Sequence, residues 1–347
     1  MRSEIQIGGR KIGDDQPVFI VAECGVTCNY DLEITKGLID TVVDAGADAI
    51  KFIFWFVDEI FSDKNTMYPY ETAEGPTERN MYDMMGELVF TIEEWKEVKQ
   101  YADSKGVIVF STVNSPSGIT WSEEIGLEAY KLSSWDFNHH PLWRNIAKQG
   151  KPMIIDTGPV HMHELAKVLS IMEEEGNDQT ILVHCFHTDK PEEMNMRSVP
   201  YLKQAFNAPV GYSATDGSYE TDIMALSMGA SFLEKRLTLD RNLPGHHHVL
   251  SLEPEEFKDY TKTMCTVQTM LGRGGLTPSP NDLSERKKWF RHLVANEDLQ
   301  AGTVLTAEMM EGKRGEIDVS PEHQDFFIGR TLKRDLKENE SITWDNV

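Results

Sequence analysis

The chain has 347 residues, of which 40% are hydrophobic and 26% are charged, and this composition is ordinary for a globular protein with a sizeable core. Its 57 acidic and 34 basic residues give a formal net charge of −23, which disfavours nucleic acid and anionic membranes as partners over most of the surface. No stretch approaches the roughly 18 uninterrupted apolar residues that a membrane-spanning helix needs.

The N-terminus and the cysteines indicate a cytoplasmic protein. The opening residues MRSEIQIGGRKIGDDQPVFIVAE carry scattered charges and lack the apolar core of a secretory signal. The four cysteines are irregularly spaced, which is typical of reduced thiols and not of a disulfide framework. Because the chain is so acidic, we expect an anionic ligand to be held by a local basic pocket.

Eight short, β-rich apolar runs alternate with segments of helical period. Segments such as DLEITKGLIDTVVDAGA lie between them, and several end in the glycine that favours a helix C-terminus. This alternation predicts the α/β class with a parallel sheet covered on both faces, and eight units favour a (β/α)8 (TIM) barrel, with an open doubly wound sheet as the alternative. The runs are VFIVAEC (18–24), AIKFIF (49–54), VIVFSTV (107–113), AYKLSS (129–134), PMIIDTG (152–158), TILVHCF (180–186), PVGYSA (209–214) and SFLEKRL (231–237).

Two segments do not follow the alternation. The connection 55–90 is long for a compact domain, so we expect it to form a lid or a substrate wall. Near the C-terminus, a stretch rich in Gly, Pro and Ser precedes a segment of short strands and turns. These features predict a barrel over 1–275, a linker over 276–288 and a small second domain over 289–347.

In a barrel of this kind the chemistry lies at the carboxyl ends of the strands. Polar residues at these ends are Glu23, Lys51, Thr112, Lys131, Ser134, Asp156, His184, Ser213 and Lys235. Lys51 and Lys131 lie in apolar runs, so they are either lysines that reach solvent or, with nearby hydroxyls, an anion pocket for phosphate or carboxylate. A lysine that forms a Schiff base would use the same position.

Acidic and histidine residues leave alternatives open. Glu23 is either a general base or an acceptor of backbone N–H groups, and Asp136 is a weaker candidate in a position typical of a turn. His184 and His187 are spaced for a metal but also suit ordinary hydrogen bonds. Three further histidines follow Pro-Gly and belong either to a substrate-contacting loop at the barrel mouth or to a solvated loop: His246, His247 and His248.

The motifs VFIVAECGV, AGADAIKF, FSTV, YKLSS, LVHC, GYS and GASFLEK occur in an order and spacing similar to those of the sialic acid synthase (N-acetylneuraminate synthase) family. The C-terminal LVANEDLQAGTVLTAEMM and IGRTLKRDLKENESIT resemble the antifreeze-like (SAF) domain of that family, a β-clip fold. The resemblance implies a barrel that condenses phosphoenolpyruvate with an N-acetylmannosamine-type sugar, with Mn²⁺ or Mg²⁺ as cofactor. It also implies a domain-swapped homodimer.

The resemblance assigns roles to individual residues. Glu23 matches the acidic residue at the catalytic centre, and Arg314 falls where the SAF arginine of the family reaches the sugar site of the partner. The positions that match phosphoenolpyruvate-binding residues are Lys51, Thr112, Lys131, Ser134 and Ser213.

The departures from the family pattern concentrate at the site. Thr215 and Arg236 stand where the two metal-binding histidines are expected. His247 replaces an acidic sugar-contacting residue. Asp156 replaces a serine that contacts phosphate, and its charge repels phosphate unless the carboxyl is protonated, turned away or paired with a lysine.

These departures predict a synthase that has lost its usual metal ligands and accepts an altered sugar aldehyde, with Arg236 or Lys235 supplying positive charge. A metal site rebuilt from His184, His187 and His247 is a variant of this reading. The other hypotheses are a Schiff-base or metal-independent lyase acting on a 2-keto acid, and a non-catalytic paralogue that binds a sugar acid.

Overall fold

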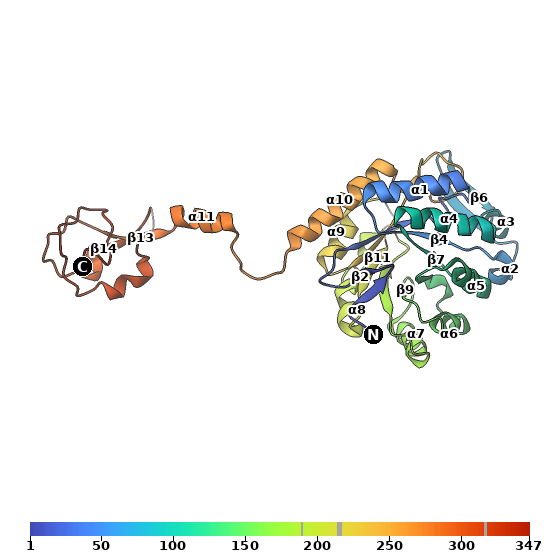
Figure 1. Ribbon diagram of the computed structural model, residues 1–347, viewed down its shortest axis with the longest axis horizontal. Coiled ribbons are helices and arrows are strands. Elements are labelled where there is room, and N and C mark those ends of the chain that lie inside the picture. Colours follow the sequence, from blue (N-terminus) through green and yellow to red (C-terminus); the bar gives the residue numbers. More distant parts are fainter. Residues whose placement is uncertain (189, 214–216, 316–317) are drawn as a thin grey trace. The chain divides into compact units, whose positions relative to one another are not determined.

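The computed structural model describes residues 1–188, 190–213, 217–315 and 318–347, and it divides into two compact units, Met1–Gly272 and Arg273–Val347. Eight parallel strands of the first unit close into a barrel in chain order (Figure 1). Each predicted run contains one strand, so the TIM barrel is confirmed and the open sheet is wrong. The strands are β3 (Phe19–Glu23), β4 (Ala49–Ile53), β7 (Ile108–Thr112), β8 (Tyr130–Leu132), β9 (Met153–Asp156), β10 (Thr180–Cys185), β11 (Val210–Ser213) and β12 (Phe232–Arg236).

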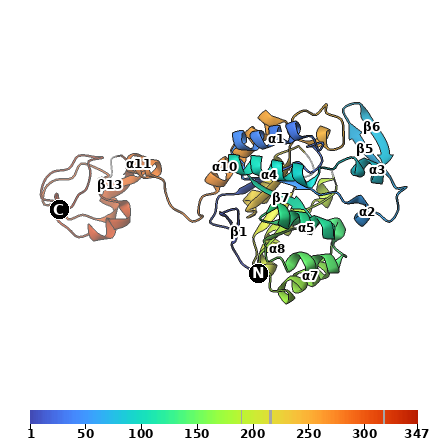
Figure 2. The same ribbon diagram turned by 45° about the vertical axis from the view of Figure 1, so that its right-hand side comes forward.

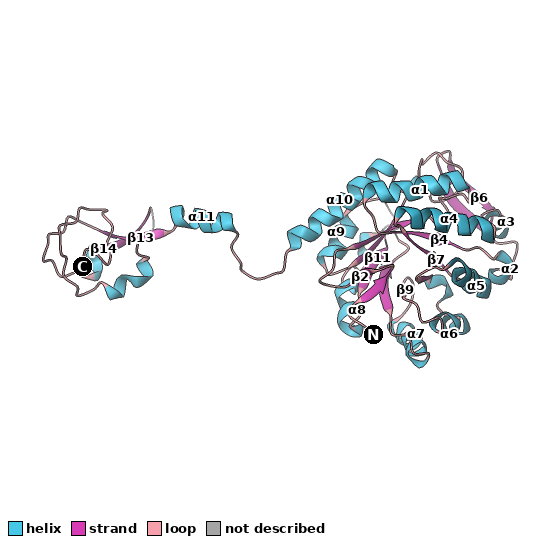
Figure 3. Cartoon of the chain, in the orientation of Figure 1, coloured by secondary structure: helices cyan, strands magenta, loops and turns pink. Residues whose placement is uncertain are grey.

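Helices surround the strands of this unit (Figure 3). Their ends carry clear local signals. The side chain of Asp31 accepts hydrogen bonds from two backbone N–H groups at the start of α1, and Gly46 ends that helix with φ of 69°. The helices are α1 (Leu32–Ala45), α2 (Val57–Ile60), α3 (Met81–Gly86), α4 (Ile92–Lys105), α5 (Pro116–Ile125), α6 (His140–Ala147), α7 (Met162–Glu174), α8 (Ser198–Phe206), α9 (Glu220–Ser227) and α10 (Pro254–Leu271).

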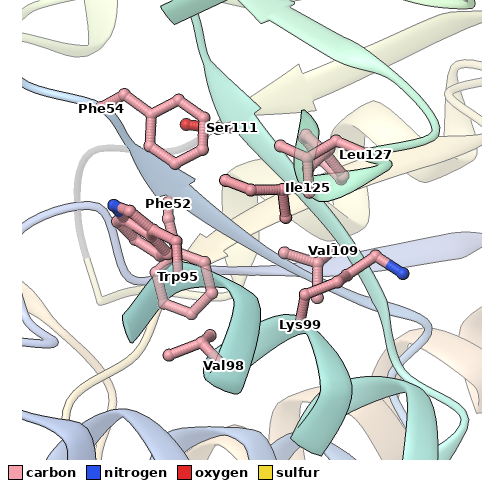
Figure 4. Close-up of a pocket in the computed structure, with 10 residues that line it drawn as sticks. Phe52, Phe54, Trp95, Val98, Lys99, Val109, Ser111, Ile125 and Leu127 are labelled. Carbon is pink, nitrogen blue, oxygen red and sulfur yellow. The ribbon is translucent and has the colours of Figure 1, made fainter. Parts of the chain in front are cut away.

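The outer face of the sheet packs against these helices. Figure 4 shows one part of this layer, where the ring of Trp95 from α4 lies over β4. Its centroid is 5.3 Å from that of Phe52 and 4.9 Å from that of Phe54. Such aromatic burial is among the larger contributions to a core, so this layer holds the barrel wall in position.

The lower half of the barrel lumen is apolar. Phe19 of β3 and Phe232 of the neighbouring strand β12 stack in it side by side, with centroids 5.8 Å apart. The N-terminal end of the barrel is covered by a hairpin of β1 (Ile5–Ile7) and β2 (Arg10–Ile12), whose isoleucines pack into the same cluster. Polar side chains of the lumen therefore gather at the opposite, C-terminal end.

The long connection after β4 has structure of its own. It contains α2, the antiparallel hairpin of β5 (Met67–Thr72) and β6 (Gly75–Asn80), and α3, which lies beside the hairpin (Figure 2). Strand β5 packs against the short turn His248–Leu250. The hairpin thus reaches the histidine loop, and its role as a substrate wall stays a prediction.

The second unit has a separate core around β13 (Arg291–Ala295) and β14 (Met310–Arg314). The predicted linker 276–288 instead contains most of helix α11 (Pro280–Trp289). Ser279 and Asp282 form a capping box at its start, a signal that the Gly, Pro and Ser content of the stretch obscured. No helix in the described residues is long and apolar enough to cross a membrane.

Candidate active site

Polar side chains replace apolar ones at the carboxyl ends of the barrel strands. Alternate residues of a strand face the lumen, so the apolar series that includes Val21 and Phe232 continues into Glu23 and Glu234. We call the inward-facing polar groups at these strand ends the lumen cluster. Its members are Glu23, Lys51, Thr112, Lys131, Asp156, Cys185, Ser213, Glu234 and Arg236.

Lys51 and Glu23 form one half of the lumen cluster. Nζ of Lys51 lies 3.0 Å from Oε1 of Glu23 and 3.8 Å from Oε1 of Glu234. Oε1 of Glu23 also accepts a hydrogen bond from the backbone N–H of Gly25 at 2.9 Å. Burial alone would raise the pKa of Glu23, but the charges of Lys51 and Arg236 outweigh it and lower that pKa to about 2. Glu23 is therefore a carboxylate at neutral pH.

Lys131 forms the other half of the lumen cluster with Glu234 and Asp156. Its Nζ lies 2.8 Å from Oε2 of Glu234 and 3.0 Å from Oδ1 of Asp156. Although burial opposes it, the charges of these two carboxylates raise the pKa of Lys131 above its usual value. Burial raises the pKa of Asp156 to about 6, against the opposing charge of Lys131. Lys131 is thus an ammonium group, which disfavours its use as a Schiff-base amine.

Glu234 was missed by the sequence analysis, yet it lies between both lysines. Burial raises the pKa of Glu234, but Lys131 and Lys51 reverse the effect and lower it. Its Oε1 also accepts a hydrogen bond from Oγ of Ser213 at 3.2 Å. Counting in twos from the buried Phe232 would have placed Glu234 in the lumen.

Lys235 does not join the lumen cluster, which corrects its assignment to the substrate site. It follows Glu234 directly and therefore faces outward, toward the helices. Its Nζ is fully buried 2.8 Å from Oδ2 of Asp222 and 5.6 Å from the ring centroid of Tyr260. Lys235 holds α9 and α10 to the barrel instead of contacting a substrate.

Arg236 faces the lumen, and its Nε lies 3.7 Å from Oε2 of Glu23. That oxygen is buried and makes no hydrogen bond within the described residues. Within those residues, no group of three His, Cys, Asp or Glu side chains is arranged to hold a metal ion. A guanidinium group has no lone pair to offer a cation, so Arg236 itself cannot act as a metal ligand, and Thr215 lies outside the described residues.

The rebuilt metal site is not assembled. His184 faces outward, where its Nε2 lies 2.9 Å from the carbonyl oxygen of Met194, and burial lowers its pKa. His187 stacks on the exposed ring of Trp135 at 4.8 Å. His184 instead lines a separate cavity of about 390 Å³ near α7 and α8. At this strand end, its chain neighbour Cys185 is the residue that faces the lumen.

The three consecutive histidines have different environments. His248 is structural, because Nδ1 lies 2.7 Å from Oγ1 of Thr238 and Nε2 lies 3.0 Å from Oδ1 of Asn29. Both ring nitrogens are thereby occupied, which corrects its assignment as a substrate contact. His246 is buried against Tyr68 and Tyr70 of the β5–β6 hairpin, with ring centroids 5.9 and 5.8 Å away.

His247 is the histidine available for a ligand. Its backbone has a φ of 73°, and its Nδ1 is buried without a hydrogen-bond partner among the described residues. Burial lowers the pKa of His247, as does the nearby charge of Arg236. Its ring is 4.4 Å from that of His246. His247 is therefore a neutral imidazole close to the lumen cluster.

The remaining predicted residues are also placed. Ser134 follows β8 and is buried against Gly158, where an added Cβ would lie 2.2 Å from the serine Oγ. Asp136 lies in the next turn, and burial raises its pKa to about 6. Arg314 is the last residue of β14 in the second unit and is exposed. Neither Ser134 nor Asp136 takes part in an ion pair of the lumen cluster within the described residues.

Comparisons with known proteins identify relatives of both units of the chain. The model of the NeuB family matches residues 38–275 and that of the SAF domain matches residues 290–347. An uncharacterised protein of Methanocaldococcus jannaschii is 31% identical over 99% of this chain and 98% of its own length. The N,N'-diacetyllegionaminic acid synthase of Legionella pneumophila is 28% identical over 100% of this chain and 99% of its own length.

A solved structure shows the same fold. The N-acetylneuraminic acid (sialic acid) synthetase of Leptospira borgpetersenii, in complex with citrate, superimposes with a TM-score of 0.73 at 28% identity. The match covers 82% of this chain and 95% of that one.

Proposed function

Because this chain belongs to the NeuB family, we propose that it condenses phosphoenolpyruvate with a sugar aldehyde to give a nonulosonic 2-keto acid. The relatives with assigned activities are sugar acid synthases, which are transferases that form a carbon–carbon bond. In the proposed reaction, C3 of phosphoenolpyruvate bonds to the aldehyde carbon, one water is consumed and inorganic phosphate is released. The observation that carries the proposal is the lumen cluster, which places two lysines and an arginine at the strand ends.

The phosphoenolpyruvate side of the site is assigned to Lys51 and Lys131. Ammonium groups and nearby hydroxyls are suitable partners for phosphate and carboxylate oxygens. The hydroxyls are those of Thr112, Ser134 and Ser213, all at strand ends. Glu23, which stays ionised, would stabilise the positive charge that develops at C2 when C3 attacks the aldehyde.

The acceptor side is assigned to Arg236 and His247. A guanidinium group can polarise an aldehyde oxygen, and a neutral imidazole can donate to or accept from a sugar hydroxyl. His246 with Tyr68 and Tyr70 would form the apolar wall against which a sugar ring packs. A second copy of the chain would add Arg314 if the protein forms a domain-swapped homodimer.

The test is an assay of phosphate release from phosphoenolpyruvate with a panel of N-acetylated sugar aldehydes. We expect release only when an aldehyde is present, together with one 2-keto acid per phosphate. Each reaction is run with added Mn²⁺ and with a chelator, and equal rates would support the role of Arg236. Phosphate release that is independent of every aldehyde would contradict the condensation.

The ion pair of Asp156 with Lys131 favours a second candidate, which is a lyase that cleaves a phosphate-free 2-keto acid. A carboxylate at this position repels phosphate but tolerates a keto acid held by the other cations. Pyruvate formed from a nonulosonic acid, without phosphoenolpyruvate, would identify this activity. Since Lys131 is held as an ammonium group, we expect no adduct on Lys131 after borohydride treatment.

A further inference from the structure

The cations of the lumen cluster are balanced by carboxylates. Three positive groups face three acidic ones among the described members, Lys51, Lys131 and Arg236 against Glu23, Asp156 and Glu234. A phosphate dianion that enters this enclosed site therefore meets no net positive charge from the described members. Burying an uncompensated charge in such a place is costly. A proton taken up by one of the carboxylates would remove this obstacle.

Asp156 is the carboxylate most able to accept that proton. Glu23 and Glu234 each accept hydrogen bonds from neighbouring groups, and their pKa values are lowered. Oδ1 of Asp156 is buried and lies 3.0 Å from Nζ of Lys131, the cation with which it forms its ion pair. The pKa of Asp156 is raised to about 6 by burial.

The groups that face Asp156 come from four other strands. Lys131 on β8 and Lys51 on β4 oppose its protonation, whereas Glu234 on β12 favours it. Cys185 on β10 is a neighbour whose pKa is raised by burial, so the thiol stays neutral. One proton on Asp156 would leave Lys131 with a single carboxylate partner and would give the described cluster a net charge of +1.

We propose that Asp156 takes up one proton when the phosphate group of the substrate binds, and that the neutral acid then donates a hydrogen bond to a phosphate oxygen. This inference rests on the proposed function. The carboxylic O–H would take the place of the serine hydroxyl that the family pattern has at this position. The proton comes from solvent and returns to it when inorganic phosphate leaves, so the overall reaction is unchanged.

The consequence is a dependence of phosphoenolpyruvate affinity on pH. Above the pKa of Asp156, the fraction of the acid form falls tenfold for each pH unit, so the dissociation constant rises by up to about tenfold per unit. A phosphate monoester has a second pKa of about 6 of its own. The comparison must therefore be made against a matched variant that binds the same ligand.

The experiment is calorimetric titration of the full-length protein with phosphoenolpyruvate at several pH values. Two buffers of different ionisation enthalpy report the number of protons taken up. Asp156→Ser provides a hydroxyl without a titratable group, and Asp156→Asn keeps the size of the side chain and donates an N–H. At pH 8 we expect wild type to take up about one proton more than either variant, and both variants to bind about 10- to 100-fold more tightly than wild type.

The possible results separate the two proposals. Equal proton uptake and parallel affinity profiles in wild type and both variants would overturn the role of Asp156 and leave the condensation standing. Binding by the variants but not by wild type at any pH would mean that Asp156 excludes phosphate, which overturns both. Absence of binding in all three folded proteins would overturn the proposed function and this inference with it.

Discussion

Lys131 pairs with two carboxylates, because it bridges Glu234 and Asp156 from a fully buried position. Such an arrangement is costly to assemble but still more costly to break. Removing one partner leaves unpaired charges in a medium that solvates them poorly, whereas removing charge in a balanced way can be nearly neutral.

We therefore expect Lys131→Met to lower the free energy of unfolding by about 3–5 kcal/mol. Adding Asp156→Asn to this variant should recover part of the loss without restoring phosphoenolpyruvate binding. Urea unfolding at pH 7 and a thermal-shift titration measure the two effects. Lys96→Met, which removes a surface pair with Glu124, is the control and should cost less than about 1 kcal/mol. Equal losses at both lysines would contradict the argument.

The contribution of Glu23 to the free energy of unfolding should depend on pH. Its pKa is lowered to about 2 in the folded protein, so its ionised form stabilises the fold above the unfolded pKa, and this stability is lost as pH falls toward 2. Glu23→Gln removes this contribution. We expect it to cost about 3 kcal/mol at pH 7, and the difference from wild type to shrink as pH is lowered below about 4.

Urea unfolding of wild type and Glu23→Gln between pH 7 and pH 3 measures this difference. Glu33→Gln, at an exposed position in the first turn of α1, serves as the control. A loss at Glu23 that does not change with pH would mean that the side chain acts through packing and not through charge.

The β5–β6 hairpin brings aromatic side chains to the histidine loop. Tyr68 and Tyr70 lie on the same face of β5 and stack with centroids 6.2 Å apart, while Met67 is exposed on the other face. Their contacts with His246 connect the long insertion after β4 to the loop after β12. Under the proposed function, we expect the position of the hairpin to affect the acceptor side of the site and not the lysine side.

Replacing Tyr68 and Tyr70 by alanine should therefore raise the KM for the aldehyde by about tenfold, the equivalent of 1–2 kcal/mol of lost aromatic contact. The dissociation constant for phosphoenolpyruvate should stay within about twofold. Steady-state kinetics with each substrate varied in turn separates the two. Met67→Ala is the control for a general disturbance of β5. An equal rise in the KM for the aldehyde in this variant would contradict a specific role of the tyrosine rings.

The alternation of strands and helices was enough to predict the barrel, since each apolar run is long enough to form a buried parallel strand. Side-chain direction was harder to predict. Lys131 and Lys235 both lie at the ends of apolar strands, yet one faces the lumen and the other faces Asp222. Since side chains alternate between the two faces of a strand, counting every second residue from a known lumen residue would have assigned the two lysines to opposite faces. The same count would have placed Glu234 in the lumen. His248 could not be assigned this way, because its partner Asn29 is 219 residues away.

Contacts between distant parts of the chain also decide whether the predicted replacement metal ligands meet. The sequence comparison put Arg236 where a metal-binding histidine is expected, and the strand register turns this position toward the lumen. The proposed replacement ligands came from three loops or strand ends whose relative placement depends on the packing of whole elements. His184 turns outward and His187 stacks on Trp135. The spacing of these histidines in the sequence therefore could not predict whether their side chains lie close together.

The net charge of the whole chain bears on how an anionic substrate arrives. With a net charge of −23, the protein repels an anion such as phosphoenolpyruvate at long range. Under the proposed function, the lumen cations attract phosphoenolpyruvate only close to the site, because these cations are already paired with carboxylates. Salt shortens the range of the repulsion from about 30 Å at 10 mM to about 8 Å at 150 mM. Salt weakens the attraction by the lumen cations less, because buried charges are poorly screened.

We expect the association rate of phosphoenolpyruvate to rise several-fold between about 10 and 150 mM KCl, in contrast to the fall seen when a protein steers its ligand electrostatically. Stopped-flow mixing that follows the fluorescence of the seven tryptophans measures the rate, and the KM of an uncharged sugar aldehyde should not change with salt. A steep fall in the association rate would mean that the lumen cations govern the field outside the barrel, and that their pairing with Glu23, Asp156 and Glu234 is weaker in solution than the ion-pair distances imply.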